Sequence, residues 1–231
     1  MVILGKNNLF EKFNKDQFLI IKEIIPKDLI SRATRKLYKI NQFFNGEFDE
    51  NGFSGSVYDF GNQISERYEI GIIAEKEVEK ILGSPLICTG FQLRMDTGGN
   101  SSELLNWHRD TDYYQNYPSK GVVAWIPLRE VNEHNGTIEL IKGQFKKEDF
   151  TPFQKEYVYE GRKPHHVWEV NPGDHKSEII QMEPGDLLLF SVLNPHKSIP
   201  NKSDITRFTI QTRFFPMFNT DLDREQLEKN F

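Results

Sequence analysis

Hydrophobic residues recur at helical spacing in about the first eighty residues of the chain. One run follows the helix-start residues Pro26 and Asp28 and has apolar positions every three or four residues: Ile30, Ala33, Leu37, Ile40 and Phe44. A second run extends from Tyr68 to Leu82 and stops at Gly83-Ser84-Pro85. Residues 51–62 lie between the runs and carry three glycines. We therefore expect two helices joined by a loop.

From Leu86 onward the pattern changes to short apolar runs separated by turn residues. Six runs have the length and composition of strands: Leu86–Met95, Gly121–Leu128, Thr137–Ile141, Glu178–Met182, Leu187–Val192 and Arg207–Phe215. Tight turns such as Asn135-Gly136 punctuate them, and the pattern indicates no long helix between them. This arrangement favours an antiparallel sandwich or jelly roll over a parallel βαβ sheet.

Two segments fall outside the strand pattern. Residues 142–171 form a long insertion with few strand signals, and loops of that length are often lids. Residues 220–229 are typical of a short helix with Thr220 as its N-cap. We expect an α+β protein with a single domain over residues 1–231. Its parts would be a mainly helical region (1–85), an all-β jelly-roll core (86–218) and a C-terminal helix (219–231).

Composition and charge exclude several classes of protein. The net charge of −5 and the pI near 5.7 argue against a non-specific nucleic-acid binder, which needs a basic face. A single cysteine, Cys88, excludes an intramolecular disulfide and a zinc site with two or four cysteines. The longest apolar runs are too short to cross a bilayer, and the N-terminus does not resemble a secretory signal. We expect a cytoplasmic protein that binds neither nucleic acid nor a membrane.

A candidate metal-binding motif is Trp107-His108-Arg109-Asp110, which follows a predicted strand and loop. In an extended segment residues i and i+2 project to the same side, so His108 and Asp110 could bind one metal ion. His196 is a candidate third ligand. Two histidines and one carboxylate form the ligand set of non-haem Fe(II) oxygenases and leave three positions open. A lone His-x-Asp is common by chance, however, and can be a surface hydrogen bond.

Arg207 lies eleven residues after His196, in a predicted strand rich in apolar residues. A guanidinium there is costly unless it is paired, and its fork fits a carboxylate. The carboxylate could belong to a ligand. It could equally belong to an Asp or Glu of the protein, which on its own is the commoner explanation for an arginine in a strand.

The ordered set of motifs from Phe91 to Phe215 resembles the phytanoyl-CoA dioxygenase-like branch of the Fe(II)/2-oxoglutarate-dependent oxygenases. The pieces follow the family's order: Gln92, Trp107-His108-Arg109-Asp110, Trp125-Ile126-Pro127-Leu128, Asn135-Gly136-Thr137-Ile138-Glu139-Leu140, Glu183-Pro184-Gly185-Asp186-Leu187-Leu188-Leu189-Phe190, His196, Ser198, Asn201, Ser203 and Arg207. The spacing from His196 to Arg207, with Ser198 between them, is similar to the family's pattern. The resemblance covers over half of the chain.

The resemblance implies a fold, a ligand set and a co-substrate. The fold would be a double-stranded β-helix, a cupin-like jelly roll, with N-terminal helices buttressing one sheet. Fe(II) would be bound by His108, Asp110 and His196. The residues implied for 2-oxoglutarate are Arg207 for its C5 carboxylate, Ser198 as a second donor, Trp125 as a wall of the pocket, and Gln92, which would reach the co-substrate or the substrate.

The implied activity is hydroxylation of an unactivated C–H bond of a small molecule, with O₂ consumed and 2-oxoglutarate converted to succinate and CO₂. Asp110 favours hydroxylation over halogenation, because halogenating relatives have a small residue in its place. The alternative is a metal-binding cupin-like protein, an isomerase or a sugar-binding module, which would have no need of Arg207. A peptide substrate is a third possibility.

The sequence also suggests positions or roles for other residues near the motifs. The segment Lys142-Gly143-Gln144-Phe145 departs from the family's pattern on the substrate side, so the substrate stays open. We expect Arg109 to face solvent, although it could instead place a positive charge near an anionic substrate. Arg94 and Arg213 could bind an anionic substrate, although internal salt bridges are more common, and Tyr113 could line the substrate mouth or pack in the core. The remaining histidines are expected in loops or on the surface: His134, His165, His166 and His175.

Overall fold

The computed structural model describes residues 6–43, 64–96, 104–157 and 165–217. Its described α-helices are α1 (Lys6–Asp16), α2 (Lys27–Phe43) and α4 (Ser65–Leu82). The last two are the helices predicted from hydrophobic spacing. Gly83 caps the C-terminus of α4: its backbone is left-handed (φ 64°), and its N–H donates to the Glu79 carbonyl. None of the helices in these ranges is long and apolar enough to cross a membrane.

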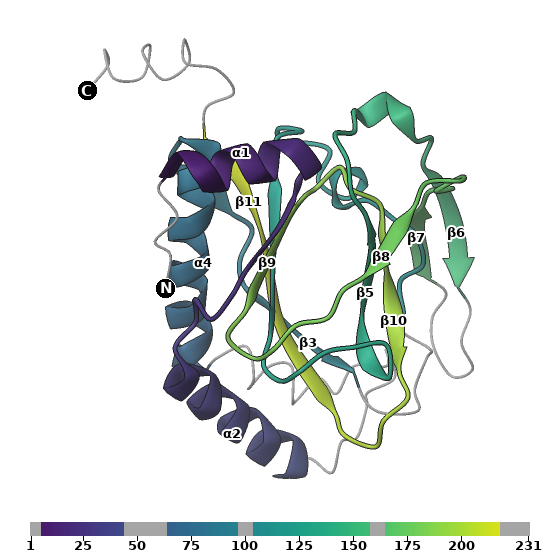
Figure 1. Ribbon diagram of the computed structural model, residues 1–231. Coiled ribbons are helices and arrows are strands. Elements are labelled where there is room, and N and C mark those ends of the chain that lie inside the picture. Colours follow the sequence, from purple (N-terminus) through teal and green to yellow (C-terminus); the bar gives the residue numbers. More distant parts are fainter. Residues whose placement is uncertain (1–5, 44–63, 97–103, 158–164, 218–231) are drawn as a thin grey trace.

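The β-structure consists of antiparallel strands in two facing sheets and a hairpin. The large sheet has the order β1-β9-β4-β11-β2, with β3 also paired to β11, and the small sheet has the order β10-β5-β8. The bounds are β1 Phe18–Ile21, β2 Leu86–Cys88, β3 Gln92–Asp96, β4 Val122–Pro127, β5 Asn135–Ile141, β8 Ser177–Ile179, β9 Leu187–Ser191, β10 His196–Asn201 and β11 Arg207–Pro216. Strands β6 (Phe153–Tyr157) and β7 (His165–Glu169) form the hairpin. Figure 1 shows the two sheets facing each other.

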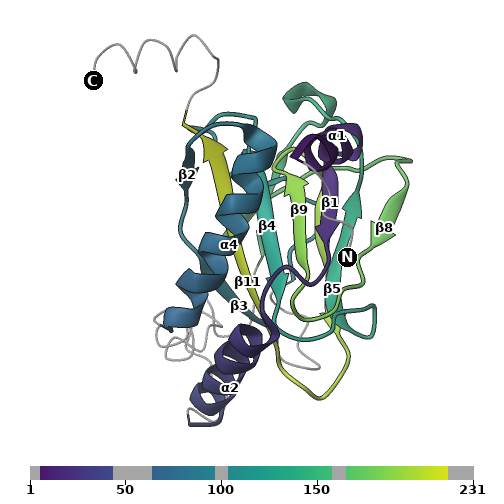
Figure 2. The same cartoon turned by 60° about the vertical axis from the view of Figure 1, so that its left-hand side comes forward.

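The large sheet is buried on both faces, and successive residues of a strand serve the two faces in turn. In β4, Val122, Ala124 and Ile126 belong to the core shared with the helices, whereas Val123 and Trp125 belong to the core between the sheets. Strand β9 alternates in the same way. Figure 2 shows α4 along the outer face of this sheet and α2 at the lower end of the strands. The predicted jelly roll with helices buttressing one sheet is confirmed.

Several elements differ from the sequence-based expectation. The predicted strand Leu86–Met95 is two strands, β2 and β3, and β1 is an additional edge strand paired with β9. The insertion at 142–171 contains the hairpin β6–β7 and a 3-10 turn, η2 (Lys147–Asp149), so the expectation of little strand there was wrong. The loop predicted at 51–62 and the helix at 220–229 lie outside the described residues, and the division into regions stays a prediction.

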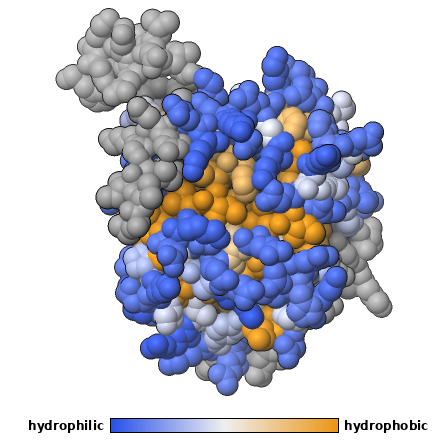
Figure 3. Space-filling model, in the orientation of Figure 1, coloured by the Kyte–Doolittle hydropathy of each residue, from blue (hydrophilic) through white to orange (hydrophobic). Residues whose placement is uncertain are grey.

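The face of the molecule in Figure 3 carries a hydrophobic band below α1, bordered by hydrophilic surface. The edge strand β1 runs through this part of the molecule in Figure 1, and all four of its residues are only partly buried. β1 has one hydrogen-bonded neighbour in the sheet order, β9, so it forms an edge of the large sheet.

Candidate functional site

Three buried side chains from distant parts of the chain meet between the two sheets. His108 precedes the 3-10 turn η1 (Asp110–Asp112), and His196 begins β10. One possible ligand atom from each of His108, Asp110 and His196 lies within 4.8 Å of the others. Reciprocal backbone hydrogen bonds hold the two segments together: His108 N–H donates to His196 O (3.0 Å), and His196 N–H donates to His108 O (2.9 Å). The convergence expected from the sequence is therefore present.

Both imidazoles are fixed through Nδ1 by the carbonyl oxygen two residues earlier. His108 Nδ1 lies 2.7 Å from Asn106 O, and His196 Nδ1 lies 3.1 Å from Asn194 O. A carbonyl oxygen only accepts, so Nδ1 carries the proton in both rings and Nε2 presents its lone pair. Burial, followed by the neighbouring His196, lowers the pKa of His108 to about 3, and burial lowers the pKa of His196. Both rings are therefore neutral near pH 7, which is the metal-binding form.

Asp110 is held by the guanidinium of Arg213 on β11. Nε of Arg213 donates to Oδ2 (2.8 Å) and Nη2 donates to Oδ1 (3.1 Å). Burial alone would raise the pKa of Asp110, but the charge of Arg213 outweighs it and holds that pKa well below its usual range. The carboxylate is therefore anionic. For Arg213, a substrate contact and an internal salt bridge were both possible, and the structure shows the salt bridge.

A cavity beside the triad is lined by the residues expected to hold the co-substrate. Trp125, Ser198 and Arg207 line it together with His108 and His196. The guanidinium of Arg207 is buried, forms an ion pair with Asp96 and lies 5.5 Å from the centre of the Trp125 ring. Among the described residues, its Nε and Nη1 have no hydrogen-bond partner. Two buried donors without an acceptor fit a ligand that brings a carboxylate.

Gln92 does not line this cavity. Its side chain is exposed at the start of β3, and its Oε1 accepts a hydrogen bond from Nη1 of Arg213 (2.9 Å). The structure thus places Gln92 behind the arginine that holds Asp110. A contact of Gln92 with the co-substrate stays a prediction.

Arg109 is fully buried, so the expectation that it faces solvent was wrong. Its Nε and Nη2 donate to the Asp112 carboxylate (3.1 and 2.9 Å), and Nη1 and Nη2 donate to the carbonyls of Lys147 (2.9 Å) and Phe150 (3.1 Å). The turn η1 brings Asp112 within reach three residues on. The carbonyls come from η2 and the residue after it, so Arg109 ties the metal-site loop to the 142–171 insertion.

Tyr113 forms a second link to the insertion. Its hydroxyl accepts from the Trp168 N–H (2.9 Å) and donates to the Trp168 carbonyl (3.2 Å) on β7. The Tyr113 ring lies edge-on to His108 with 6.1 Å between centres, and the side chain is 42% exposed. Tyr113 therefore sits at the rim of the site.

The remaining described histidine side chains are on the surface, as expected: His134, His166 and His175 are exposed. In the described ranges, the triad is the sole group of three or more His, Cys, Asp or Glu close enough to share a metal ion. The sequence indicated an internal salt bridge for Arg213 but did not identify Asp110 as its partner. Its signal is the even spacing from Arg207, which puts both on one face of a strand.

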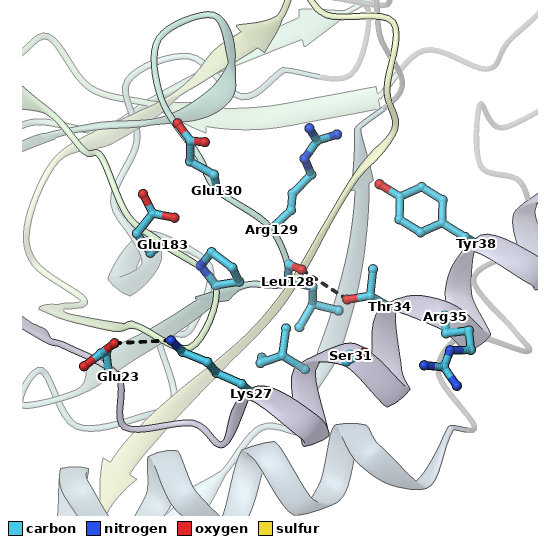
Figure 4. Close-up of a pocket in the computed structure, with 12 residues that line it drawn as sticks. Glu23, Lys27, Ser31, Thr34, Arg35, Tyr38, Leu128, Arg129, Glu130 and Glu183 are labelled. Carbon is cyan, nitrogen blue, oxygen red and sulfur yellow. Dashed lines mark hydrogen bonds and ion pairs between the residues drawn. The ribbon is translucent and has the colours of Figure 1, made fainter.

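A second, larger cavity of about 740 Å³ lies away from the triad, between α2 and the loops after β4 and before β9. Figure 4 shows side chains of both charge signs around it, including Lys27, Arg129, Glu130 and Glu183. Thr34 donates to the Leu128 carbonyl at its floor (3.1 Å). This cavity contains neither a triad residue nor Arg207.

Comparison with known proteins gives consistent matches. Residues 13–209 match the family profile described as phytanoyl-CoA dioxygenase (PhyH). The chain is 30% identical over 152 residues to 1-deoxypentalenic acid 11-beta-hydroxylase of Streptomyces exfoliatus, covering 60% of this chain and 52% of that protein. The chain thus spans about half the length of this curated relative.

Solved structures show the same fold at low identity. The non-heme alpha ketoglutarate dependent epimerase SnoN from nogalamycin biosynthesis superposes with a TM-score of 0.67 at 13% identity, covering 92% of this chain and 81% of its own. The nickel complex of the non-heme monooxygenase ThoJ gives a TM-score of 0.62 at 17% identity, with coverages of 90% and 77%.

Proposed function

Because the chain belongs to the phytanoyl-CoA dioxygenase family of non-haem Fe(II)/2-oxoglutarate-dependent oxygenases, we propose that it hydroxylates an unactivated C–H bond of a small molecule. The observation that carries the proposal is the buried triad beside a cavity in which Arg207 keeps two donors without acceptors. The triad fits a metal that needs open positions, and Arg207 fits a co-substrate with a carboxylate.

The triad residues would hold the ion in a defined way. His108 and His196 would bind through Nε2, since Nδ1 of each ring donates to a carbonyl, and Asp110 would bind through a carboxylate oxygen. Because both histidines are neutral and Asp110 is anionic near pH 7, these residues can bind the metal without first losing a proton. Three protein ligands leave three positions for the co-substrate and O₂.

The cavity residues would orient the co-substrate. Arg207 would bind the C5 carboxylate through Nε and Nη1, Ser198 would donate its hydroxyl, and Trp125 would flank the carbon chain. The apolar side chains of Ile138 and Phe190 line the same cavity and would keep water out. When bound together, Fe(II), 2-oxoglutarate and O₂ supply the oxidation, with succinate and CO₂ released and one oxygen atom placed on the substrate.

Several observations bear on the reaction and on the substrate class. Asp110 occupies the carboxylate position, which favours hydroxylation over halogenation. Family membership and the open donors of Arg207 argue against the cupin-like alternative without oxygenase chemistry. The curated relative is named as a hydroxylase of a small organic acid. Small-molecule acids are therefore the first substrate class to test.

The test is a screen for substrate-stimulated turnover. Purified protein with Fe(II), ascorbate and 2-oxoglutarate is incubated with a panel of small-molecule acids under ¹⁸O₂, and succinate and product masses are measured. The proposal expects extra succinate and a product that gains one ¹⁸O atom, both lost in His196→Ala. Turnover of 2-oxoglutarate with an organic product of unchanged mass would indicate epimerisation and contradict hydroxylation.

A further inference from the structure

We propose that Arg213 is a positioning residue that keeps the Asp110 carboxylate from binding the metal with both of its oxygens. The inference rests on the proposed function, because it concerns how the triad presents itself to the ion. Its basis is the fork between Arg213 and Asp110, in which two nitrogens reach two different carboxylate oxygens at 2.8 and 3.1 Å. Both side chains are buried, with 9% and 3% of their surface exposed.

The fork occupies a particular edge of the carboxylate. A carboxylate has about four lone-pair sites, two on each oxygen. The sites that point along the edge shared by both oxygens are the ones that a bidentate guanidinium uses, and they are also the ones that a chelated metal ion uses. With Arg213 on that edge, Asp110 has only its outer lone pairs for a metal. It can then fill one coordination position but not two.

The strand and its neighbours hold the arginine in this pose. Arg207, Thr209, Gln211 and Arg213 alternate along β11 and all line the cavity, so one strand face carries both buried arginines. The nitrogen of Arg213 that does not touch Asp110 donates to Gln92 Oε1 (2.9 Å). All three guanidinium nitrogens therefore have a carboxylate or amide partner.

Charge balance alone does not explain Arg213. A bound divalent ion would itself neutralise Asp110, and a second cation on the same carboxylate weakens its attraction for the metal. Burying that guanidinium also costs desolvation free energy. The coordination geometry explains why Arg213 is there. A chelating Asp110 would take one of the three positions that 2-oxoglutarate and O₂ need, whereas a carboxylate bound through one oxygen leaves them open.

The chain contains a matched control for this arrangement. Arg109 forks Asp112 through the same two nitrogens, Nε and Nη2, and is also buried. Asp112 is not part of the triad. Replacing either arginine by lysine keeps the charge and removes the fork, but only the change at position 213 alters the carboxylate expected to bind the metal.

The experiment counts metal-bound water in protein loaded with Mn(II), a stand-in for Fe(II) that is stable in air. Water-proton relaxation gives the number of exchangeable waters on the ion, and calorimetry gives the affinity of the loaded protein for 2-oxoglutarate. For the wild type and for Arg109→Lys we expect three waters. For Arg213→Lys we expect two waters and 2-oxoglutarate binding weakened about tenfold, a usual cost of losing an outer-shell partner.

The outcomes separate this inference from the proposed function. Wild-type water number and 2-oxoglutarate affinity in Arg213→Lys would overturn the inference alone, because a lysine would then suffice as counter-ion. A wild type that binds no Mn(II) would overturn both. If Arg213→Lys does not fold, Gln92→Leu replaces it, since that change removes the amide that holds Nη1. Fewer than three metal-bound waters in Gln92→Leu support the inference, and three waters overturn it.

Discussion

Backbone carbonyls two residues before each imidazole set the tautomers of His108 and His196, and a guanidinium sets the carboxylate of Asp110. At the scale of single residues, each ligand is thus fixed by a contact away from the point where the three meet. Such outer contacts orient metal ligands and account for a large part of a site's affinity. Arg207 differs, since its ion pair with Asp96 leaves two donors open toward the cavity.

Arg207→Lys keeps the positive charge beside Asp96 but removes the fork. We expect 2-oxoglutarate binding to weaken by roughly tenfold or more, since a hydrogen bond to a charged group contributes about 1.5–3 kcal/mol. Calorimetry on Mn(II)-loaded protein measures the change, and the affinity for Mn(II) itself should stay within about threefold of the wild type. Unaltered 2-oxoglutarate affinity would place the carboxylate clamp elsewhere.

Arg109→Met leaves the buried carboxylate of Asp112 without a counter-ion. We expect the free energy of unfolding to fall by about 3–5 kcal/mol, the usual cost of breaking a buried ion pair on one side. Urea denaturation measures it. The double variant Arg109→Met, Asp112→Leu should recover part of the loss, because it removes the unpaired charge as well. A loss below about 1 kcal/mol in the single variant would contradict a structural role for this pair.

At the scale of elements, Glu66 joins the two helices that cover the large sheet. Its buried carboxylate on α4 accepts from Lys36 on α2 (2.9 Å) and lies 3.7 Å from Arg32. Burial by itself would raise the pKa of Glu66, but the hydrogen bond from Lys36 and the other polar contacts lower it below 4.5 overall. Because the folded-state pKa is the lower one, this contact stabilises the fold above the unfolded-state pKa, and the stabilisation is lost as the pH falls through the folded-state value.

Glu66→Gln should therefore reduce the free energy of unfolding at pH 7 by about 1 kcal/mol, a modest value because Lys36 is half exposed. The difference from the wild type should shrink as the pH falls below 4.5. Urea denaturation at a series of pH values measures it. Glu69→Gln is the matched control: Glu69 contacts the same Arg32 but is 48% exposed, so its effect should stay within about 0.5 kcal/mol. If the difference in unfolding free energy between Glu66→Gln and the wild type grew toward low pH, the predicted direction of the pH dependence would be wrong.

Hydrophobic pattern predicted α2, α4 and the strands of the large sheet other than β1, because buried positions in these elements are occupied by apolar residues. β4 and β9 are continuous apolar runs, which are typical of strands buried on both faces. The four apolar residues of β1 could equally belong to a helix, and β6 and β7 are mostly polar. None of these three strands therefore produces a clear strand pattern in the sequence. Their pairing depends on partners far away in the sequence.

The same distinction applies to the site. His108, Asp110 and His196 were recognisable because metal binding restricts residue type and spacing, and the Arg207 motif follows from the need to pair a buried guanidinium. The burial of Arg109 was not predictable, since two of its acceptors are carbonyls 38 and 41 residues further along the chain. Such contacts carry no side-chain signature. The role of Gln92 behind Arg213 was hidden for a similar reason, as it depends on the register between β3 and β11.

At the scale of the whole molecule, the jelly roll brings the start of β10 beside the loop that carries His108 and Asp110, and it encloses the cavity between its two sheets. The site is therefore a property of the folded state, and a metal that binds there stabilises folding. We expect Mn(II) at one hundred times its dissociation constant to raise the unfolding free energy by about 2.7 kcal/mol, seen as a higher melting temperature. His108→Ala and excess chelator should both abolish the increase. An equal increase in His108→Ala would put the binding site elsewhere.

We expect one metal ion to bind the three converging side chains, with the co-substrate beside it. A crystal structure of the protein with Mn(II) and 2-oxoglutarate tests it most directly. We expect one ion contacted by Nε2 of His108, Nε2 of His196 and a single oxygen of Asp110, with the far carboxylate of 2-oxoglutarate on Nε and Nη1 of Arg207. An ion bound away from these side chains, or a co-substrate that leaves Arg207 untouched, would contradict it.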